Sequence, residues 1–232
     1  MPDMIKAVMF DFSGTLFRIE PVGEWWQATV DALGLDVPEA EAAACVDRLS
    51  ALGALPGSPY GVVPQELAGL WRERDLDMVR HRAAYTGLTR AAELPDPRLV
   101  DALYERHLAP AAWRPYPDTA ATLAELRRRG LPVAVVSNIG WDLRPVFRHH
   151  GVDELVDAYV LSFEQGVQKP DAAIFETACR ELGHHPSDVL MVGDDLTADA
   201  GATALGCAFH PVDHRPVDER PAGLTPLLDL LD

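Results

Sequence analysis

The chain has 232 residues, with 20 basic and 36 acidic side chains, a formal charge of -16 and a pI near 4.8. Hydrophobic residues make up 48% and charged residues 24%, which is typical of a globular protein and excludes a disordered or fibrous one. The acidity, without any run of basic residues, argues against nucleic acid as a partner. The length suits one core domain with an insert.

The start of the chain and its cysteines bear on the compartment. Met1 to Phe10 carry one lysine and a short apolar run that leads into Asp11, unlike a signal peptide. No stretch is long enough to span a bilayer. Cys45, Cys179 and Cys207 are odd in number and far apart in the sequence, which suits a reducing compartment. We therefore expect a cytoplasmic protein without a membrane partner. The oligomeric state stays open.

The first predicted element is a buried strand at residues 5–10, which breaks into a loop at Asp11-Phe12-Ser13-Gly14-Thr15. Residues 18–115 then show helical patterns separated by glycine and proline turns, and no further apolar strand. The predicted helices are 24–33, 39–52, 64–82 and 97–108. We predict that residues 18–115 form a smaller helical cap domain inserted after the first strand.

Residues 116–232 alternate between strand and helix patterns. Buried strands are predicted at 131–136, 158–161 and 189–192, and helices at 117–129, 143–150, 171–182, 197–205 and 224–231. This alternation predicts an α/β fold, with a doubly wound parallel sheet covered by helices on both faces. Residues 1–17 and 116–232 would together form this core domain.

Polar residues follow three of the predicted strands: Asp11, then Ser137-Asn138, then Asp194-Asp195. Ligands of open α/β sheets bind outside the carboxyl ends of the strands. We therefore expect these side chains to converge on one site. An ordinary turn after each strand is the alternative.

Lysine use singles out one further residue. Only Lys6 and Lys169 are lysines, and the other 18 basic residues are arginines. Because an ammonium is a compact point charge, its retention in the loop before the predicted helix 171–182 favours a functional role for Lys169. The alternative is an exposed loop cation.

The acidic residues near the predicted site indicate a metal ion. Asp194, Asp195 and Asp199 would bring three more carboxylates close to Asp11, and unneutralised carboxylates raise one another's pKa. Oxygen ligands with room for water suit Mg²⁺, which can also clamp a phosphoryl oxygen. Asp195 is expected instead to cap the helix near Thr197.

The ordered motifs resemble those of the haloacid dehalogenase-like superfamily across essentially the whole core. They are Asp11-Phe12-Ser13-Gly14-Thr15-Leu16, Ser137-Asn138, Lys169-Pro170-Asp171, and Gly193-Asp194-Asp195 with Asp199. The resemblance implies a Rossmann-like hydrolase in which Asp11 attacks phosphorus or carbon and forms an ester that water resolves.

The resemblance also implies roles for the other motif residues. Ser137 and Asn138 would bind the transferring group, and Lys169 would neutralise its charge and that of Asp11. The implied Mg²⁺ ligands are Asp11, the backbone carbonyl of Ser13 and Asp194, with Asp199 nearby or acting through water.

One position departs from the family pattern. Phosphatases of this superfamily usually carry a second Asp two residues after the nucleophile, where this chain has Ser13. That Asp protonates the leaving alkoxide and then activates water, and such general acid–base help contributes about 10² to 10⁴ in rate. A serine hydroxyl is a poor substitute. Release of the group from Asp11 is then the step in question.

Four activities remain open. The prediction we favour is Mg²⁺-dependent hydrolysis of a small phosphorylated metabolite through phospho-Asp11. A 2-haloacid dehalogenase needs no acid, because halide leaves unprotonated, but it would leave Asp194, Asp195 and Asp199 without a counter-ion. Phosphonoacetaldehyde cleavage requires a cap lysine, and residues 18–115 contain none. The fourth possibility is a catalytically impaired module that binds a phosphorylated metabolite or a protein.

The predicted cap carries two further features. Trp25-Trp26 lies soon after its start, and adjacent helical residues point in different directions, so we expect core packing rather than one shared substrate pocket. Four arginines recur along the predicted helix 64–82, where we expect a solvated face. They are Arg72, Arg74, Arg80 and Arg82.

Overall fold

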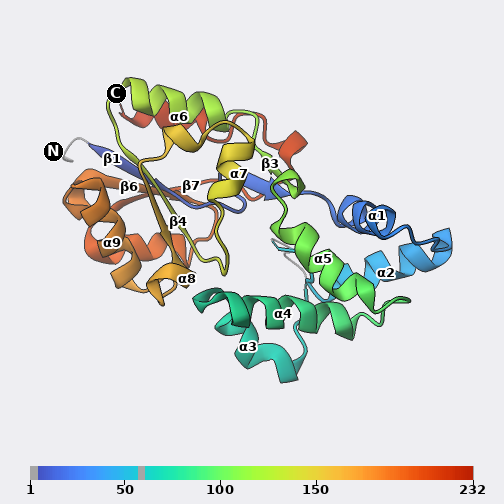
Figure 1. Cartoon of the computed structure of the whole chain (residues 1–232). Helices are drawn as coiled ribbons and strands as arrows, with labels where there is room; N and C mark the ends of the chain where they lie inside the picture. The colour runs from blue at the N-terminus through green and yellow to red at the C-terminus, as the bar shows by residue number, and fades with distance from the viewer. Residues whose placement is uncertain (1–4, 57–60, 232) are drawn as a thin grey trace.

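The computed structural model describes residues 5–56 and 61–231. Its main feature is a five-stranded sheet in the order β5-β4-β1-β6-β7, in which all neighbouring strands are parallel (Figure 1). The strands are β1 (Ala7–Phe10), β4 (Val133–Ser137), β5 (Ala158–Leu161), β6 (Val189–Gly193) and β7 (Ala208–Pro211). The predicted parallel α/β fold is confirmed.

Successive residues of the central strand β1 face opposite sides of the sheet. Val8 and Phe10 belong to one hydrophobic cluster with residues of α6 (Thr119–Arg128) and α7 (Arg144–His149). Ala7 and Met9 belong to a second cluster with residues of α9 (Ala172–Leu182). All four side chains are fully buried. Helices on both faces therefore explain why the strand is continuously apolar.

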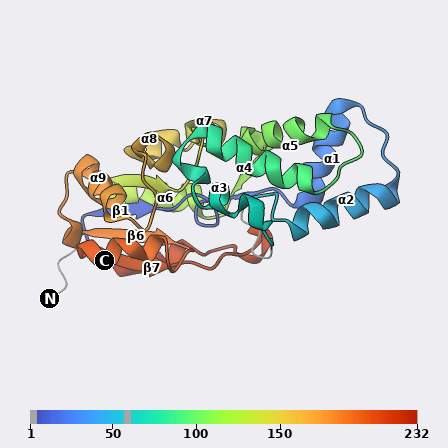
Figure 2. The ribbon, with the colours of Figure 1, turned by 90° about the horizontal axis from the view of Figure 1, so that it is seen from below.

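The chain between β2 (Phe17–Ile19) and β3 (Trp113–Pro115) is helical. Its α-helices are α1 (Val22–Leu33), α2 (Glu39–Ala51), α3 (Ala68–Arg72), α4 (Met78–Ala91) and α5 (Arg98–Leu108). We call residues 22–108 the helical insert, and Figures 1 and 2 show it beside the sheet. Because β2 and β3 pair antiparallel, both connections between the helical insert and the sheet run through one two-stranded ribbon.

The single helix predicted at residues 64–82 is wrong. The chain forms η1 (Gln65–Leu67), α3 and η2 (Arg74–Leu76), and α4 begins only at Met78. Asp77 has an extended backbone, and its carboxylate accepts a hydrogen bond of 2.8 Å from the backbone N–H of Arg80, as an N-cap does. Arg72 and Arg74 consequently do not share a helix with Arg80 and Arg82.

Two other predicted helices have a different geometry. Residues 199–205 and 225–231 form the 3₁₀-helices η6 (Asp199–Leu205) and η8 (Thr225–Leu231). Gly201 within η6 lies so close to Pro170 that a Cβ there would be 2.6 Å from the Cβ of Pro170. Glycine lowers α-helix stability by about 1 kcal/mol relative to alanine, which favours a short, tight turn here. The helices predicted at 143–150 and 171–182 form as α7 and α9.

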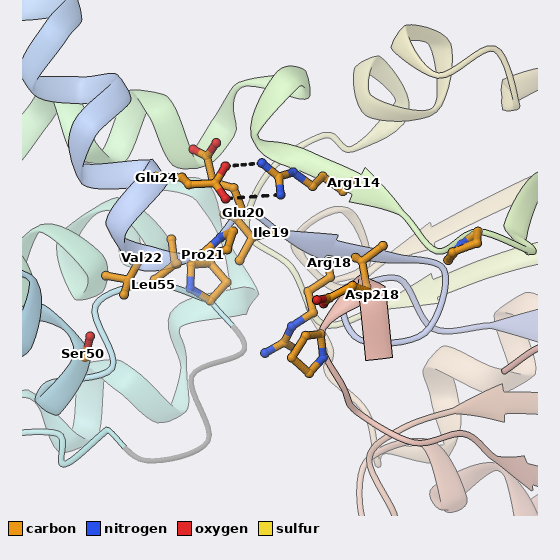
Figure 3. A pocket seen from close by; sticks show the side chains of 14 residues that line it. Arg18, Ile19, Glu20, Pro21, Val22, Glu24, Ser50, Leu55, Arg114 and Asp218 are labelled. Atoms are coloured by element: carbon orange, nitrogen blue, oxygen red, sulfur yellow. Dashed lines mark hydrogen bonds and ion pairs between the residues drawn. The ribbon is translucent and has the colours of Figure 1, made fainter. Parts of the chain in front are cut away.

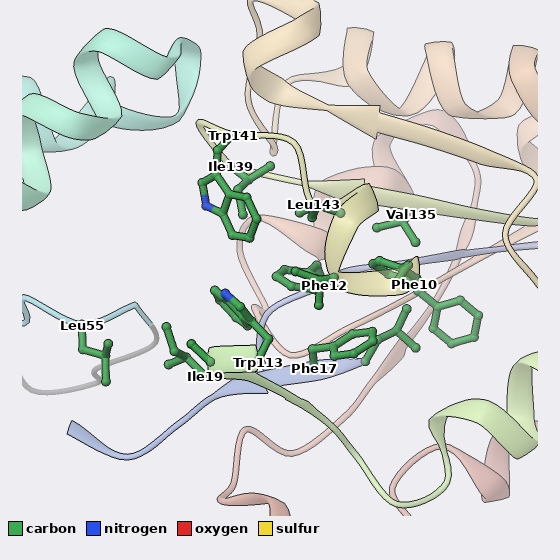
Figure 4. Packing of buried hydrophobic residues seen from close by; sticks show 14 of the residues in the cluster. Phe10, Phe12, Phe17, Ile19, Leu55, Trp113, Val135, Ile139, Trp141 and Leu143 are labelled. Atoms are coloured by element: carbon green, nitrogen blue, oxygen red, sulfur yellow. The ribbon is translucent and has the colours of Figure 1, made fainter. Parts of the chain in front are cut away.

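Aromatic side chains connect the ribbon to the sheet (Figure 4). The ring centroids of Phe12 and Trp113 lie 4.6 Å apart, and those of Phe17 and Phe147 lie 4.9 Å apart. Trp141, in the loop after β4, also packs against Phe12. These contacts hold the loop that follows β1 against the rest of the core.

Both adjacent tryptophans of α1 are buried in the hydrophobic cluster, as expected for core residues. Trp25 is 1% and Trp26 is 2% exposed, and the Trp25 indole donates to the carbonyl of Leu103 at 3.0 Å. Both side chains therefore belong to the hydrophobic core. Among the described residues, no helix combines the length and the apolar character that a membrane crossing requires.

Candidate active site

The predicted site residues meet at the carboxyl ends of the parallel strands. Asp11 follows β1, Asn138 follows β4 and Asp194 follows β6. Ser137 is the buried last residue of β4. Lys169 comes from the loop between α8 (Ser162–Gln165) and α9. The sheet therefore brings together residues that are more than 150 positions apart in the chain.

Lys169 is a buried cation between two carboxylates. Its Nζ donates to Oδ1 of Asp11 at 2.7 Å and to Oδ1 of Asp199 at 2.5 Å. Asn138 fixes its backbone, because its Oδ1 accepts from the Lys169 N–H at 2.7 Å and its Nδ2 donates to the Lys169 carbonyl at 2.9 Å. Both polar atoms of the Asn138 side chain thus hold the backbone of Lys169 in place.

The three aspartates after β6 take different positions. Asp199 is fully buried, and its Oδ2 accepts from the backbone N–H of Asp195 at 3.0 Å. The Asp195 carboxylate is exposed and accepts from the N–H groups of Thr197 and Ala198, so it caps the turn. Asp194 accepts from the Thr15 hydroxyl at 3.1 Å.

A divalent cation fits the geometry of this site. Asp11, Asp194 and Asp199 each offer one carboxylate oxygen, and these three oxygens lie within 4.8 Å of one another. The ammonium of Lys169 contacts two of these carboxylates, those of Asp11 and Asp199. Mg²⁺ prefers hard oxygen ligands, and carboxylates in excess of the neighbouring positive charge provide them here.

The pKa shifts point to the same surplus of negative charge. Burial raises the pKa of Asp11 well above its ordinary value, although the ammonium of Lys169 acts against the rise. Burial also raises the pKa of Asp199. For Asp194, burial acts in the same direction, but a hydrogen bond from His214 contributes to a pKa below the ordinary value. A cation would therefore help to keep Asp11 ionised.

The loop after Asp11 requires glycine at one position. Gly14 has φ of +94°, and a Cβ there would lie 2.5 Å from Oδ2 of Asp194. Its N–H donates to the carbonyl of Phe17 at 2.7 Å. The guanidinium of Arg220 donates to the carbonyls of Gly14, at 2.7 Å, and Thr15. The half-buried Ser13 is therefore held in a tight, fixed turn.

Sequence reasoning missed Arg18, His214 and Arg220. Nδ1 of His214 lies 2.5 Å from Oδ2 of Asp194, and Arg18 contacts the other ring nitrogen of His214. His214 and Arg220 belong to a proline-rich stretch after the last strand that matches no motif. Its position after β7 was the one signal available, and β7 itself was not predicted.

A pocket of about 600 Å³ lies beside the ribbon, between the helical insert and residues 216–218 (Figure 3). We call it the hinge pocket; its lining includes Arg18, Val22, Leu55, Arg114, Val217 and Asp218. The Arg114 guanidinium is paired with the Glu24 carboxylate. Arg18 connects the pocket wall to His214 and so to Asp194.

A parallel sheet with a buried carboxylate after its central strand and an ammonium beside it is the arrangement of an α/β hydrolase. The family model of haloacid dehalogenase-like hydrolases matches residues 5–205. The chain belongs to this family.

Its relatives include two kinds of hydrolase. The chain is 29% identical over 221 residues to ribulose-1,5-bisphosphate 5-phosphatase from Halopiger xanaduensis, covering 88% of this chain and 82% of that protein. It is 29% identical over 160 residues to (S)-2-haloacid dehalogenase 4A from Burkholderia cepacia, covering 63% and 69%. The crystal structure of L-2-haloacid dehalogenase from Xanthobacter autotrophicus superposes with a TM-score of 0.64 and 26% identity, covering 98% and 88%. The relatives of this chain thus include enzymes named as phosphatases and enzymes named as dehalogenases.

Proposed function

We propose that the protein is a Mg²⁺-dependent hydrolase that acts on a small phosphorylated metabolite through phospho-Asp11. The observation that carries this proposal is the cluster of Asp11, Asp194 and Asp199, in which three carboxylates lie together and the buried Lys169 ammonium bonds to two of them, Asp11 and Asp199. In a phosphatase, the surplus negative charge of these carboxylates would bind a divalent cation. A metal-free dehalogenase would have to bury the same negative charge without compensation.

Asp11 attacks phosphorus, the P–O bond to the alcohol breaks, and the phosphoryl group becomes an acyl phosphate on the carboxylate. Water then attacks the same phosphorus and regenerates Asp11. Lys169 neutralises charge on Asp11 and on the phosphoryl oxygens, while Ser137 and Asn138 bind the group at the end of β4. When bound by Asp11, the Ser13 carbonyl and Asp194, with Asp199 nearby, Mg²⁺ supplies charge neutralisation and orientation.

The helical insert acts as a cap in this proposal, and the hinge pocket receives the organic part of the substrate. The pocket combines apolar side chains such as Val22 and Leu55 with a few charged groups, the usual composition of a small-molecule site. Its wall residue Arg18 is two hydrogen-bonded contacts away from Asp194.

Ser13 limits the substrates that such an enzyme turns over quickly. Without a carboxyl group at this position, no strong acid protonates the alkoxide there. Substrates with good leaving groups, such as acyl phosphates and aryl phosphates, should have a higher kcat/KM than alkyl phosphates, because the leaving group departs in the first half-reaction. Hydrolysis of phospho-Asp11 should be the slow half-reaction.

Dehalogenation is the second candidate, and Ser13 is the observation that favours it. A halide leaves carbon without a proton, so Asp11 could form an alkyl ester and release halide with no acid at residue 13. The matches to a haloacid dehalogenase sequence and structure are compatible with this reaction.

A screen of phosphate esters, acyl phosphates and 2-haloacids, each with and without Mg²⁺, tests these functions. Phosphate release that requires Mg²⁺ supports the proposal, and halide release without Mg²⁺ supports the second candidate. Asp11→Asn serves as the control, since full activity of this variant would exclude a nucleophilic role for Asp11. Phosphate binding without any turnover would indicate a binding module.

A further inference from the structure

Asp194 is held from both sides. The Thr15 hydroxyl donates to its Oδ1 at 3.1 Å, and Nδ1 of His214 lies 2.5 Å from its Oδ2. Rotation of the carboxylate would break both contacts. Its remaining lone pairs therefore keep one direction relative to Asp11 and Asp199, the other two carboxylates of the cluster.

The hydrogen-bond roles of the His214 ring follow from Arg18. A guanidinium can only donate, so Nε2 of His214 accepts from Nη1 of Arg18. With Nε2 accepting, the ring N–H lies on Nδ1 and donates to Asp194. Arg18 thus fixes the tautomer in which His214 is a donor to the carboxylate.

The segment that carries His214 is clamped on both sides. The carbonyl of Asp213 accepts from Arg220 at 2.9 Å, and the carbonyl of Arg215 accepts from the Tyr116 hydroxyl at 2.6 Å. The Arg220 guanidinium lies over the Tyr116 ring, 3.2 Å from its centroid. Arg220 also bonds to the loop after Asp11, so the histidine and the nucleophile loop are tied to one guanidinium.

Gly14 leaves the space that this arrangement occupies. A Cβ at Gly14 would lie 2.4 Å from Nδ1 of His214 and 2.5 Å from Oδ2 of Asp194. A side chain at residue 14 would therefore displace both His214 and Asp194. The contact between these two residues thus depends on glycine at this position of the loop.

We propose that His214 is a positioning residue that orients Asp194 as a ligand of the divalent cation, with Arg18 setting its tautomer. The inference rests on the proposed function, since it assumes a cation at Asp11 and Asp194. Partners that orient a metal ligand typically account for about 10- to 100-fold in metal affinity. His214 acts through Asp194 and needs no contact with substrate.

Mn²⁺ binding to the full chain tests the proposal, measured by electron paramagnetic resonance of the free ion, with Mg²⁺ as competitor. His214→Phe keeps a ring but has no donor, and it should weaken Mn²⁺ binding by about tenfold or more. His214→Asn places an amide N–H near the position of Nδ1, and it should restore the affinity to within about threefold of the wild type. His149→Phe, on an exposed histidine at the end of α7, is the matched control and should leave the affinity unchanged.

The proposal is overturned if His214→Phe binds Mn²⁺ as tightly as the wild type, or if His214→Asn binds as weakly as His214→Phe. Thermal unfolding without metal checks that the variants fold. If His214→Phe does not fold, Arg18→Leu replaces it, and unchanged Mn²⁺ affinity in that variant overturns the tautomer argument. A wild-type chain that binds no divalent cation would contradict the proposed function itself, a result distinct from equal binding by wild type and variants.

Discussion

Two groups of polar side chains, most of them buried, lie on opposite sides of the contact between the sheet and the helical insert, and they differ in charge. The core cluster is Asp11, Lys169, Asp194 and Asp199. The insert cluster is Arg74, Asp75, His81, Tyr85 and His107. The hydroxyl of Ser162, at the start of α8, donates to the carbonyl of Asp75 at 2.6 Å and so joins the insert cluster to the core domain.

The insert cluster balances its own charge. Nη2 of Arg74 lies 3.2 Å from Oδ2 of Asp75, and the guanidinium stacks over Trp71, 4.2 Å from its centroid. Burial lowers the pKa of His81 to about 3, with Arg74 adding to the effect, so the 3.8 Å contact with Asp75 is not an ion pair. His81 instead shares a hydrogen bond of 2.9 Å with the Tyr104 hydroxyl.

The core cluster holds three carboxylates and one ammonium, which contacts Asp11 and Asp199, whereas Asp194 contacts His214. Buried charge without compensation costs several kcal/mol, whereas a paired and hydrogen-bonded cluster is tolerated. The insert cluster is therefore complete as a structural element. In the proposed function a divalent cation balances the core cluster, so the two clusters differ as a functional and a structural group of charges would.

Replacement of Lys169, the ammonium of the core cluster, should have the largest effect on activity. Lys169→Met leaves the carboxylates of the core cluster without their ammonium, and we expect kcat/KM to fall by about 10³-fold, equivalent to about 4 kcal/mol. Steady-state kinetics with Mg²⁺ on a substrate found in the screen measures this. Lys6→Met, which removes the other lysine from an exposed pair with Asp188, is the control. Similar losses in both variants would remove the special role of Lys169.

Acidification should destabilise the protein through the insert cluster. Burial keeps the pKa of His81 at about 3 and that of His107 well below its ordinary value, whereas the unfolded imidazoles titrate near about 6.5. Between those values the unfolded state binds more protons, so the free energy of unfolding falls as pH decreases. For each imidazole the slope approaches about 1.4 kcal/mol per pH unit well below a pH of about 6.5, where the unfolded imidazole is fully protonated.

Urea unfolding between pH 7 and pH 5 measures this slope. Other groups titrate in the same range, so the useful quantity is the difference between the wild type and His81→Gln. The variant should show a slope shallower by about 1 kcal/mol per pH unit, averaged over this range. Equal slopes would mean that His81 is not kept neutral by the fold.

A carboxyl group at residue 13 should improve phosphatase turnover. Ser13→Asp supplies the missing acid and base, and we expect kcat on alkyl phosphates to rise by about tenfold, short of the full range for general acid–base catalysis. Ser13→Asn has a similar shape without an exchangeable proton of suitable pKa, and it should give no gain. If Ser13→Asp also gives none, the core cluster serves another reaction.

The smallest expected effect concerns the hinge pocket. Leu55→Trp places a larger side chain in the pocket lining, and the KM of a bulky aryl phosphate should rise about fivefold more than that of acetyl phosphate. Val79→Trp, on an exposed residue of α4, should leave this ratio unchanged. Equal changes in both KM values for Leu55→Trp would place the organic group outside the hinge pocket.

Burial decided which strands could be predicted. The three central strands β1, β4 and β6 are buried throughout, so they are unbroken apolar runs that overlap their predicted ranges. The edge strand β5, whose last two residues are buried, was also predicted. The edge strand β7 has exposed ends, and β2 and β3 contain three residues each, so none of them has such a run. The break between α3 and α4 was missed because it is marked by Asp77, the N-cap at which α4 begins, and not by a change in hydrophobicity.

The sequence by itself determined the nucleophile candidate Asp11, the lysine, the acidic residues after β6 and the family they indicate, because these residues lie in contiguous motifs at strand ends. Only the tertiary structure decided that Asn138 fixes the Lys169 backbone and that Arg18 and His214 reach Asp194. Those contacts join segments far apart in the chain, and they depend on the order of strands in the sheet, which no local pattern encodes. The surplus charge of the core cluster became visible in the same way, through distances between side chains.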